Sequence, residues 1–257
     1  MAPTVIFIRH AEARHNATNK SLHGHQLGFG EQCDELAKHL ENELPLAHEI
    51  ELIVVSPMRR TLQTAQVSKL SFRFDDVTPY LGPQYLCSVQ ALGWLMKKGV
   101  PVILRAEFQE NSAKPCDTGS PIPEMEREWP QFDWSTVDPR YPATDGLYEC
   151  SRKGLTRRGI AARNFLRNRP EKIIAVVSHA GFLRTSLCSR RFDNADYRIF
   201  NFGEEDEGDI PRLVEWELTE TKGGGLGKSE KGVFELNDGD YAPEKPEPEE
   251  VVSENPS

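Results

Sequence analysis

The sequence predicts an α/β fold, a three-layer α/β/α sandwich with a mostly parallel central sheet. Short apolar segments with the composition of buried strands recur along the chain, and segments with helical periodicity separate them. The expected strands are 5–8, 51–57, 101–108, 172–179 and 212–219. The expected helices are 31–44, 59–70, 84–98, 124–129, 155–170 and one that starts at residue 180. This alternation is typical of helices packed on a parallel sheet.

Two of the expected strands end in polar residues that can carry chemistry. Strand 5–8 is a run of bulky apolar side chains, and Arg9 and His10 follow it directly. Strand 172–179 also has a histidine, His179, at its carboxyl end. Ligands bind beyond the carboxyl ends of strands in open α/β sheets, so these residues are candidates for one shared site.

Apolar spacing defines the helices between these strands. Leucine recurs every fourth residue between 36 and 44, which predicts an amphipathic helix that stops near Pro45. The helix that follows strand 51–57 carries Arg59 and Arg60 in its first turn. These arginines therefore also lie near the carboxyl end of a strand.

Composition divides the chain into a body, an insertion and a tail. Residues 1–219 are expected to form one catalytic domain. Within it, residues 111–148 are rich in Pro, Gly, Trp and acidic residues and show no sustained period, so we expect an insertion that caps a pocket and selects the substrate. Residues 220–257 are glycine-rich and then acidic, which predicts a flexible tail that is dispensable for chemistry.

Charge and cysteine content exclude several classes of protein. The net charge of the 257 residues is -9, and residues 220–257 contribute -6 of it, from ten acidic and four basic side chains. The body has no basic stripe of the kind that binds nucleic acid. No apolar run reaches the roughly 18 residues of a membrane helix, and no signal peptide is expected. Five scattered cysteines without a CxxC pair suit a reducing, cytoplasmic compartment.

The residue types at the strand ends suit phosphoryl transfer. A histidine can attack an electrophilic phosphorus, and the planar fork of an arginine matches phosphate oxygens. No metal is expected, because the two histidines of the loop at 23 and 25 lack cysteine or carboxylate partners at matching spacing. For the dipeptide Arg9-His10 alone, the simpler interpretation is a pair of surface residues at the end of a strand. Only the rest of the chain argues against this interpretation.

Four sequence blocks resemble those of the histidine phosphatase (phosphoglycerate mutase-like) superfamily, branch 1. RHAEARHN at 9–16 is similar to its RHGE(T/S)xxN motif, and SPMRRTLQTA at 56–65 is similar to its second block. SHAGFLR at 178–184 resembles the late SHGGFL block. AEFQENSAKPCDTGS at 106–120 resembles the region of the proton donor in fungal-type members. The blocks occur in the family order and imply a phosphoglycerate mutase-like fold.

The resemblance implies a role for each matching residue. His10 would be the nucleophile that is transiently phosphorylated. Arg9 and Arg60 would bind the phosphoryl oxygens, whereas Arg59 falls at the variable position. His179 would donate to the phosphate and stabilise charge in the transition state.

Further residues follow from the same comparison. Glu110 would protonate the leaving oxygen and then deprotonate the attacking water. Glu107, three residues away, is the competing candidate. Asn16 and Ala180 would line the substrate pocket.

The implied function is a metal-independent phosphatase that hydrolyses a small phosphorylated metabolite through a phosphohistidine intermediate, with no cofactor. The alternatives are a phosphoglycerate mutase-type phosphotransferase and a member repurposed for binding or for a biosynthetic step. The chain departs from the family pattern at Ala11 and Ala180, where glycine is common, and at Gly28, where threonine is typical. The two alanines are tolerable because alanine is small, whereas the region of Gly28 shapes the pocket edge and concerns substrate preference. Neither a nucleic acid nor a membrane is an expected partner.

Overall fold

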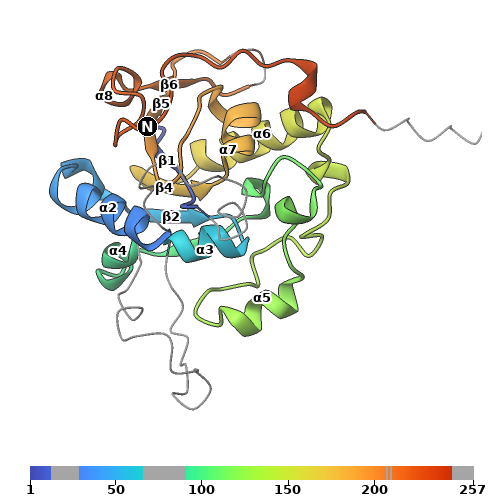
Figure 1. Ribbon diagram of the computed structural model, residues 1–257, viewed down its shortest axis with the longest axis horizontal. Helices are drawn as coiled ribbons and strands as arrows, with labels where there is room; N and C mark the ends of the chain where they lie inside the picture. The colour runs from blue at the N-terminus through green and yellow to red at the C-terminus, as the bar shows by residue number, and fades with distance from the viewer. Residues whose placement is uncertain (13–28, 66–90, 207, 209, 245–257) are drawn as a thin grey trace, which may run out of the picture.

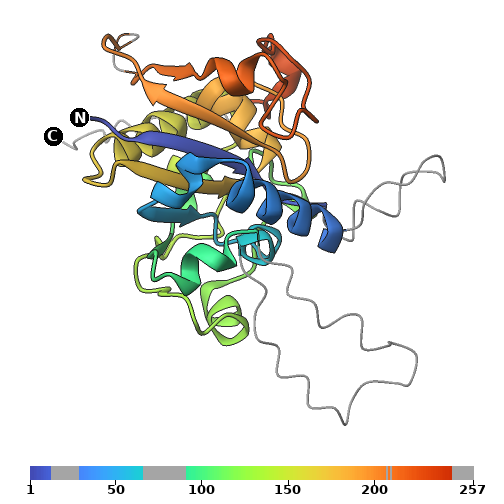
Figure 2. The ribbon, with the colours of Figure 1, turned by 90° about the vertical axis from the view of Figure 1, so that its left-hand side faces the viewer.

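A six-stranded sheet forms the middle layer of the molecule. The structure is a computed structural model that describes residues 1–12, 29–65, 91–206, 208 and 210–244. The strands are β1 (Thr4–Arg9), β2 (Leu52–Val55), β3 (Val102–Leu104), β4 (Ile173–Ser178), β5 (Tyr197–Phe202) and β6 (Leu213–Glu215). Their order is β3-β2-β4-β1-β5-β6, and Figure 2 shows β5, β1, β4 and β2 side by side. The four strands β1, β2, β3 and β4 run parallel to one another, whereas β5 is antiparallel to its neighbours β1 and β6. The predicted mostly parallel sheet is therefore confirmed.

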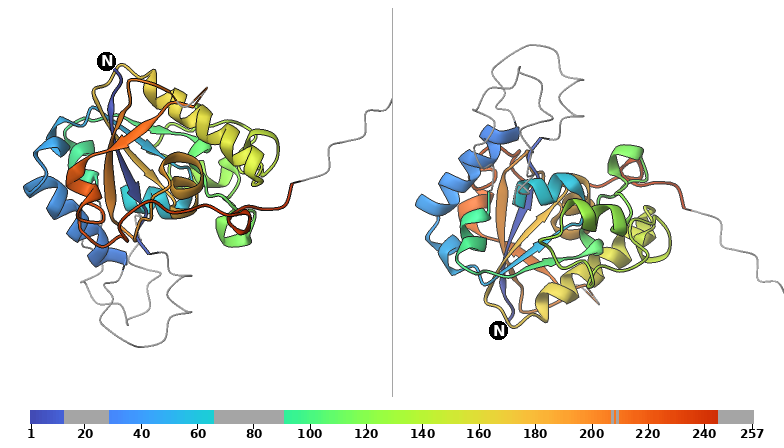
Figure 3. Two further views of the ribbon diagram at one scale, coloured as in Figure 1. Left: turned by 90° about the horizontal axis from the view of Figure 1, so that it is seen from above. Right: turned by 90° about the horizontal axis from the view of Figure 1, so that it is seen from below.

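Helices cover both faces of the sheet (Figures 1 and 3). One face carries α2 (Phe29–Asn42), α3 (Arg59–Ala65) and α4 (Gly93–Lys97). The other carries α6 (Arg152–Arg167), α7 (Ala180–Phe182) and the π-helical turn η7 (Leu183–Cys188). The remaining helices are α5 (Ile122–Glu128), α8 (Glu217–Glu220) and the short 3-10 turns η1 (Pro45–Glu49), η4 (Ala106–Phe108), η5 (Pro115–Asp117), η6 (Gly146–Tyr148) and η8 (Asp238–Asp240). Among the helices of the described ranges, none has the length and apolar character to cross a membrane.

Strand β1 explains why buried strands were recognisable as continuous apolar runs. Successive side chains of a strand point to opposite faces of the sheet. Ile6 and Ile8 pack in the cluster under α2, α3 and α4, whereas Val5 and Phe7 pack in the cluster under α6 and α7. Because both faces are covered, every position from Val5 to Ile8 is apolar and no polar alternation remains.

The structure differs from the expected elements in three places. β5 was not predicted, because Arg198 interrupts its apolar pattern and is buried against a partner distant in the sequence. The expected strand 101–108 ends at Leu104, after which the chain turns into η4. The expected strand 212–219 divides into β6 and α8. Parts of the expected helices 59–70 and 84–98 lie outside the described residues.

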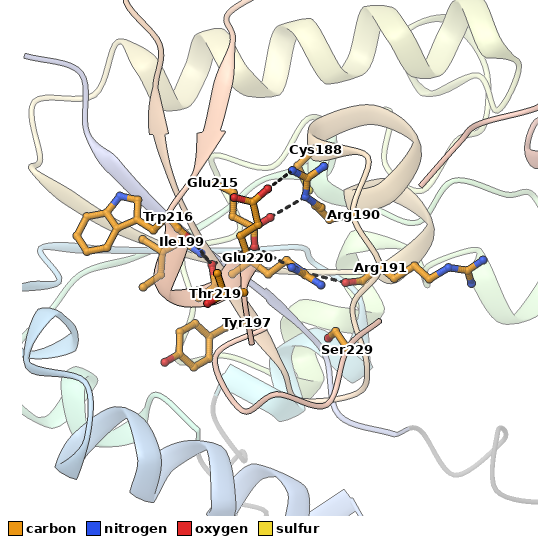
Figure 4. A network of polar contacts seen from close by, with 12 residues as sticks. Cys188, Arg190, Arg191, Tyr197, Ile199, Glu215, Trp216, Thr219, Glu220 and Ser229 are labelled. Carbon is orange, nitrogen blue, oxygen red and sulfur yellow. Dashed lines mark hydrogen bonds and ion pairs between the residues drawn. The ribbon is translucent and has the colours of Figure 1, made fainter. Parts of the chain in front are cut away.

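A buried polar network fastens β5 to β6 and to the chain before β5 (Figure 4). The Glu215 carboxylate accepts hydrogen bonds from Arg198 Nη1 at 2.7 Å and from Arg190 Nε at 2.6 Å. Arg198 also donates to the backbone carbonyls of Arg191 at 2.9 Å and Glu230 at 2.8 Å. Buried charges are tolerated when they are paired and hydrogen-bonded, and this network meets that condition for Arg198 and Glu215.

Residues 221–244 lie on the body, where the sequence predicted a flexible tail. The buried carboxylate of Asp196 accepts the backbone N–H groups of Leu226 at 2.9 Å, Lys228 at 3.3 Å and Ser229 at 3.1 Å, together with the Ser229 hydroxyl at 2.6 Å. Gly224 has φ +87°, and a Cβ there would collide with this carboxylate. The glycine run therefore wraps closely around an internal anion instead of acting as a linker.

The same segment continues across the second helical layer. Phe234 N–H donates to the Ser189 carbonyl at 2.8 Å, just after η7. Ala242 then pairs with Ser151, at the start of α6, in an isolated parallel bridge. Figure 1 shows this path from α8 over α7 toward the start of α6. Residues 245–257 of the expected tail lie outside the described part of the chain.

Candidate active site

The carboxyl ends of neighbouring parallel strands bring the two predicted histidines together. Arg9 and Ser178 are paired at the ends of β1 and β4, so the residues that follow them, His10 and His179, are also adjacent. Their ring centroids are 5.2 Å apart. Arg60, in the first turn of α3, reaches the same place, because α3 follows β2 on the other side of β4.

The imidazole of His10 has a defined tautomer. The side chain is buried, and its Nδ1 lies 2.6 Å from the backbone carbonyl oxygen of Ala11. A carbonyl oxygen only accepts, so Nδ1 carries the proton in this contact. In the neutral ring, Nε2 then holds the lone pair that a nucleophile needs.

His179 has the opposite tautomer. Arg60 Nε donates to its Nδ1 at 2.9 Å, which leaves the proton of the neutral ring on Nε2. This Nε2 lies 2.9 Å from the hydroxyl oxygen of Ser56. Full burial lowers the pKa of His179 well below its usual value, and the Arg60 charge lowers it further. His179 is therefore a neutral hydrogen-bond donor, and the positive charge beside it comes from arginines.

The insertion supplies partners to the other side of Arg60. Its Nη1 donates to the carbonyl of Cys116, and its Nη2 lies 3.3 Å from Asp117 Oδ1. The same Nη2 lies 3.6 Å from Glu110 Oε2. Arg59, one residue earlier, instead pairs with Glu124 and Glu128 of α5 on the surface.

Glu110 is held with one oxygen fixed by the backbone. Its Oε1 accepts the N–H groups of Asn111 and Phe182, each at 2.9 Å, which leaves Oε2 beside Arg60. Burial raises the pKa of Glu110 above its usual value, although Arg60 opposes the shift. A raised pKa keeps the carboxyl group protonated to higher pH, and Oε2 is the oxygen free to carry that proton.

The competing candidate, Glu107, lies in a different environment. Its carboxylate pairs with Arg105, whose Nε is 3.0 Å from Glu107 Oε2. The structure thus places Glu110, and not Glu107, beside Arg60. Asn16 lies outside the described residues.

Arg9 borders a cavity of about 520 Å³ on the β5 side of the two histidines. Its Nη1 donates to the Phe192 carbonyl at 2.7 Å and lies 4.0 Å from Asp193 Oδ1. Ala180 lies on the same wall. The remaining lining comes from Arg184, Arg191, Phe192, Asp193, Lys228, Ser229 and Glu230. The C-terminal segment therefore shapes a cavity for which the sequence had suggested only the insertion.

Comparison with known families gives one match to a family model. Residues 87–204 match the model of the histidine phosphatase superfamily (branch 1). The chain resembles this superfamily over that segment, which is just under half of its length. The matched segment includes Glu110 and His179, whereas His10 and Arg60 lie before it.

The proteins to which this chain is similar carry phosphatase and mutase-like names. A Schizosaccharomyces pombe protein named "Probable phosphatase" is 26% identical, over 70% of this chain and 76% of the relative. A "phosphoglycerate mutase-like protein" of Arabidopsis thaliana is 29% identical, over 75% of this chain and 76% of the relative. A solved mycobacterial hydrolase is 15% identical with a TM-score of 0.46, over 84% of this chain and 97% of that chain.

Two residues of this candidate site were not recognised from the sequence. Asp117 was part of a quoted motif but was given no role. Arg158 is fully buried in α6, and its Nη2 donates to the Glu110 carbonyl at 2.9 Å. The available signal was its position on the buried stripe of the helix, between Leu155 and Ala162. Within the described ranges, no three His, Cys, Asp or Glu side chains group as they would around a metal ion.

Proposed function

We propose that this chain is a metal-independent phosphomonoester hydrolase that uses His10 as its nucleophile. The observation that carries the proposal is the Nδ1 contact of His10 with the Ala11 carbonyl, which places the ring proton on Nδ1 and the nucleophilic lone pair on Nε2. Arg60, the neutral His179 and a carboxyl group of raised pKa lie around it. Together they provide a nucleophile, an oxyanion site and a general acid.

In the first step, His10 Nε2 attacks the phosphorus of the substrate and the bond to the leaving oxygen breaks. Glu110 transfers its proton to that oxygen, so the product leaves as an alcohol. Arg9 and Arg60 hold the phosphoryl oxygens, and His179 exchanges the hydrogen bond of its Nε2 proton with the Ser56 hydroxyl for one with these oxygens. The result is a phosphohistidine and a Glu110 carboxylate.

In the second step, the Glu110 carboxylate removes a proton from a water molecule as its oxygen attacks the phosphohistidine. The P–N bond breaks, phosphate leaves, and both His10 and Glu110 return to their starting states. A mutase would instead deliver the phosphoryl group to an organic acceptor. Release of inorganic phosphate separates the two reactions.

The proposal extends to the substrate and the compartment. The cavity beside Arg9 has room for the remaining part of a small phosphorylated metabolite. A reducing cytoplasm is part of the proposal, and the free state of the four described cysteines supports it.

Phosphorylation of His10 is the direct test. With p-nitrophenyl phosphate and excess EDTA, we expect the protein to release nitrophenolate and phosphate in equal amounts. Acid-labile, base-stable phosphate should appear on the protein during turnover, as a phosphoimidazole requires. His10→Ala should abolish both signals, and His48→Ala, a surface control, should keep them. Turnover by His10→Ala, or its loss in EDTA alone, would contradict the proposal.

Gly181 provides a test of the Glu110 position. A Cβ at residue 181 would collide with Glu110 Oε1 and with Asn111 Oδ1. Gly181→Ala should therefore displace the carboxyl group and lower kcat by about 10²-fold, with little change in Tm, since displacement of about 1 Å has effects of that size. In a Glu110→Gln background the same substitution should add little, because both act on one group. Independent, multiplicative losses would refute this interpretation.

A further inference from the structure

Two carboxyl groups share one guanidinium nitrogen in the site. Arg60 Nη2 lies 3.3 Å from Asp117 Oδ1 and 3.6 Å from Glu110 Oε2. All three side chains are largely buried, with exposed fractions of 7% for Arg60, 10% for Glu110 and 22% for Asp117. Because one arginine charge faces two acidic groups, the ionisation of each carboxyl group depends on the other.

We propose that Asp117 is a positioning residue of the reaction. Its carboxylate neutralises the guanidinium charge of Arg60, so that Glu110 keeps the proton that it donates to the leaving oxygen. The proposal rests on the role of Glu110 in the proposed function. It assigns to the insertion a part in proton transfer, in addition to its expected part in substrate selection.

The contacts of the two carboxyl groups decide which one carries the proton. Asp117 Oδ2 accepts the hydroxyl of Ser112 at 2.6 Å, which fixes the carboxyl group so that Oδ1 faces Arg60 Nη2. Asp117 is also about twice as exposed as Glu110, so its charge is better solvated. Glu110 is the more deeply buried group, and desolvation favours its neutral form. Burial therefore favours the proton on Glu110.

The charged groups around Glu110 show why an anion is needed. Arg9 of β1, Arg60 of α3 and Arg158 of α6 all interact electrostatically with Glu110. Three cations would favour its ionised form and remove the acid. Asp117 opposes them, and its charge raises the pKa of Glu110.

Asp117 also fixes the direction of the guanidinium. Nη1 of Arg60 donates to the carbonyl of residue 116, and Nη2 donates to the carboxylate of residue 117. The third nitrogen, Nε, donates to His179 Nδ1. This contact sets the tautomer in which His179 donates from Nε2. The η5 turn, which contains both residues, is thus connected to the acid and to the phosphate-binding histidine.

Asp117→Asn tests the proposal, because asparagine retains the size and the acceptor oxygen but removes the charge. With glutamate labelled by ¹³C at Cδ, and the Glu110 signal assigned through its loss in Glu110→Gln, the carboxyl titration of Glu110 should move about one pH unit lower. The fall of kcat/KM on the basic side of its pH profile should move to lower pH by the same amount. At pH 7, kcat should be reduced and KM little changed. The NMR measurement does not require turnover.

Glu124→Gln is the matched control. It removes a carboxylate from the same insertion, where Glu124 pairs with the neighbouring Arg59. The control should leave the Glu110 titration and the pH profile unchanged. A Glu110 titration in Asp117→Asn that superimposes on the wild type, with or without a loss of Tm, would overturn the proposal. A shifted titration in a protein without phosphatase activity would overturn the proposed function and leave the coupling of Asp117 to Glu110 intact.

Discussion

Replacement of Glu110 with glutamine is expected to lower kcat for an alkyl phosphate by about 10²–10⁴-fold, the usual contribution of a general acid-base residue. Glutamine keeps the shape of the side chain and the oxygen that accepts from Asn111 and Phe182. Its amide group has no acidic proton to transfer to the leaving oxygen. Steady-state kinetics across a pH series checks this result. In the wild type, activity should fall as the pH rises through the raised pKa of Glu110, because the acid form is then lost.

The choice of leaving group separates the two roles of Glu110. Nitrophenolate leaves without protonation, so the first step with p-nitrophenyl phosphate should survive in Glu110→Gln. The second step still needs a base for water, so it should become slow. We expect a burst of nitrophenolate close to one equivalent per enzyme, followed by slow turnover and accumulation of phosphorylated His10.

Glu107→Gln is the control for this prediction, because Glu107 is also an acidic residue of the same segment and pairs with Arg105. It should retain the wild-type dependence on leaving group. A burst and a loss of kcat in Glu107→Gln, with normal kinetics in Glu110→Gln, would reverse the assignment.

A chain that ends after Glu220 is expected not to fold. The deletion removes all four hydrogen bonds from residues 226–229 to the Asp196 carboxylate, and it removes the Glu230 carbonyl from Arg198. Hydrogen bonds to charged groups contribute about 1.5–3 kcal/mol each. Their combined loss is comparable with the total stability of a domain, about 5–15 kcal/mol. Thermal unfolding followed by circular dichroism should show no cooperative transition.

A chain that ends after Glu244 is the control, because it keeps every contact of the described C-terminal segment. Its Tm and kcat should match those of the full chain. A folded and active chain ending at residue 220 would contradict the anchoring role of Asp196. It would also restore the expectation from the sequence that everything after residue 219 is dispensable.

Local patterns predicted the parts of the fold whose cause is local. β1 and β4 are covered on both faces, so each appears in the sequence as an unbroken apolar run, and the polar residue after each run marks the edge where the site forms. The helical stripe of α2 is equally local. Because His10 and His179 directly follow such runs, their proximity was predictable once parallel pairing was assumed.

The features that were missed depend on partners distant in the sequence. Arg198 makes β5 resemble a polar segment, since its partner Glu215 is 17 residues further on. The glycines at 223–227 have the composition of a linker, and only the position of Asp196 shows that they wrap a carboxylate. Asp117 lies in a loop without periodicity, and its contact with Arg60 spans 57 residues.

The anchoring of β5 by residues 226–230 has a consequence for biosynthesis. The parallel strands β1 to β4 pair with one another within residues 1–178, so this part of the sheet can assemble while the rest of the chain is still being made. Asp196 and Arg198 form hydrogen bonds with residues that lie 30 and 32 positions further along the chain. The cavity beside Arg9, whose wall includes Lys228, is therefore completed only once this late segment has left the ribosome. Partly synthesised chains carry both histidines but lack that wall, so the substrate binding that we propose there would follow translation of the segment.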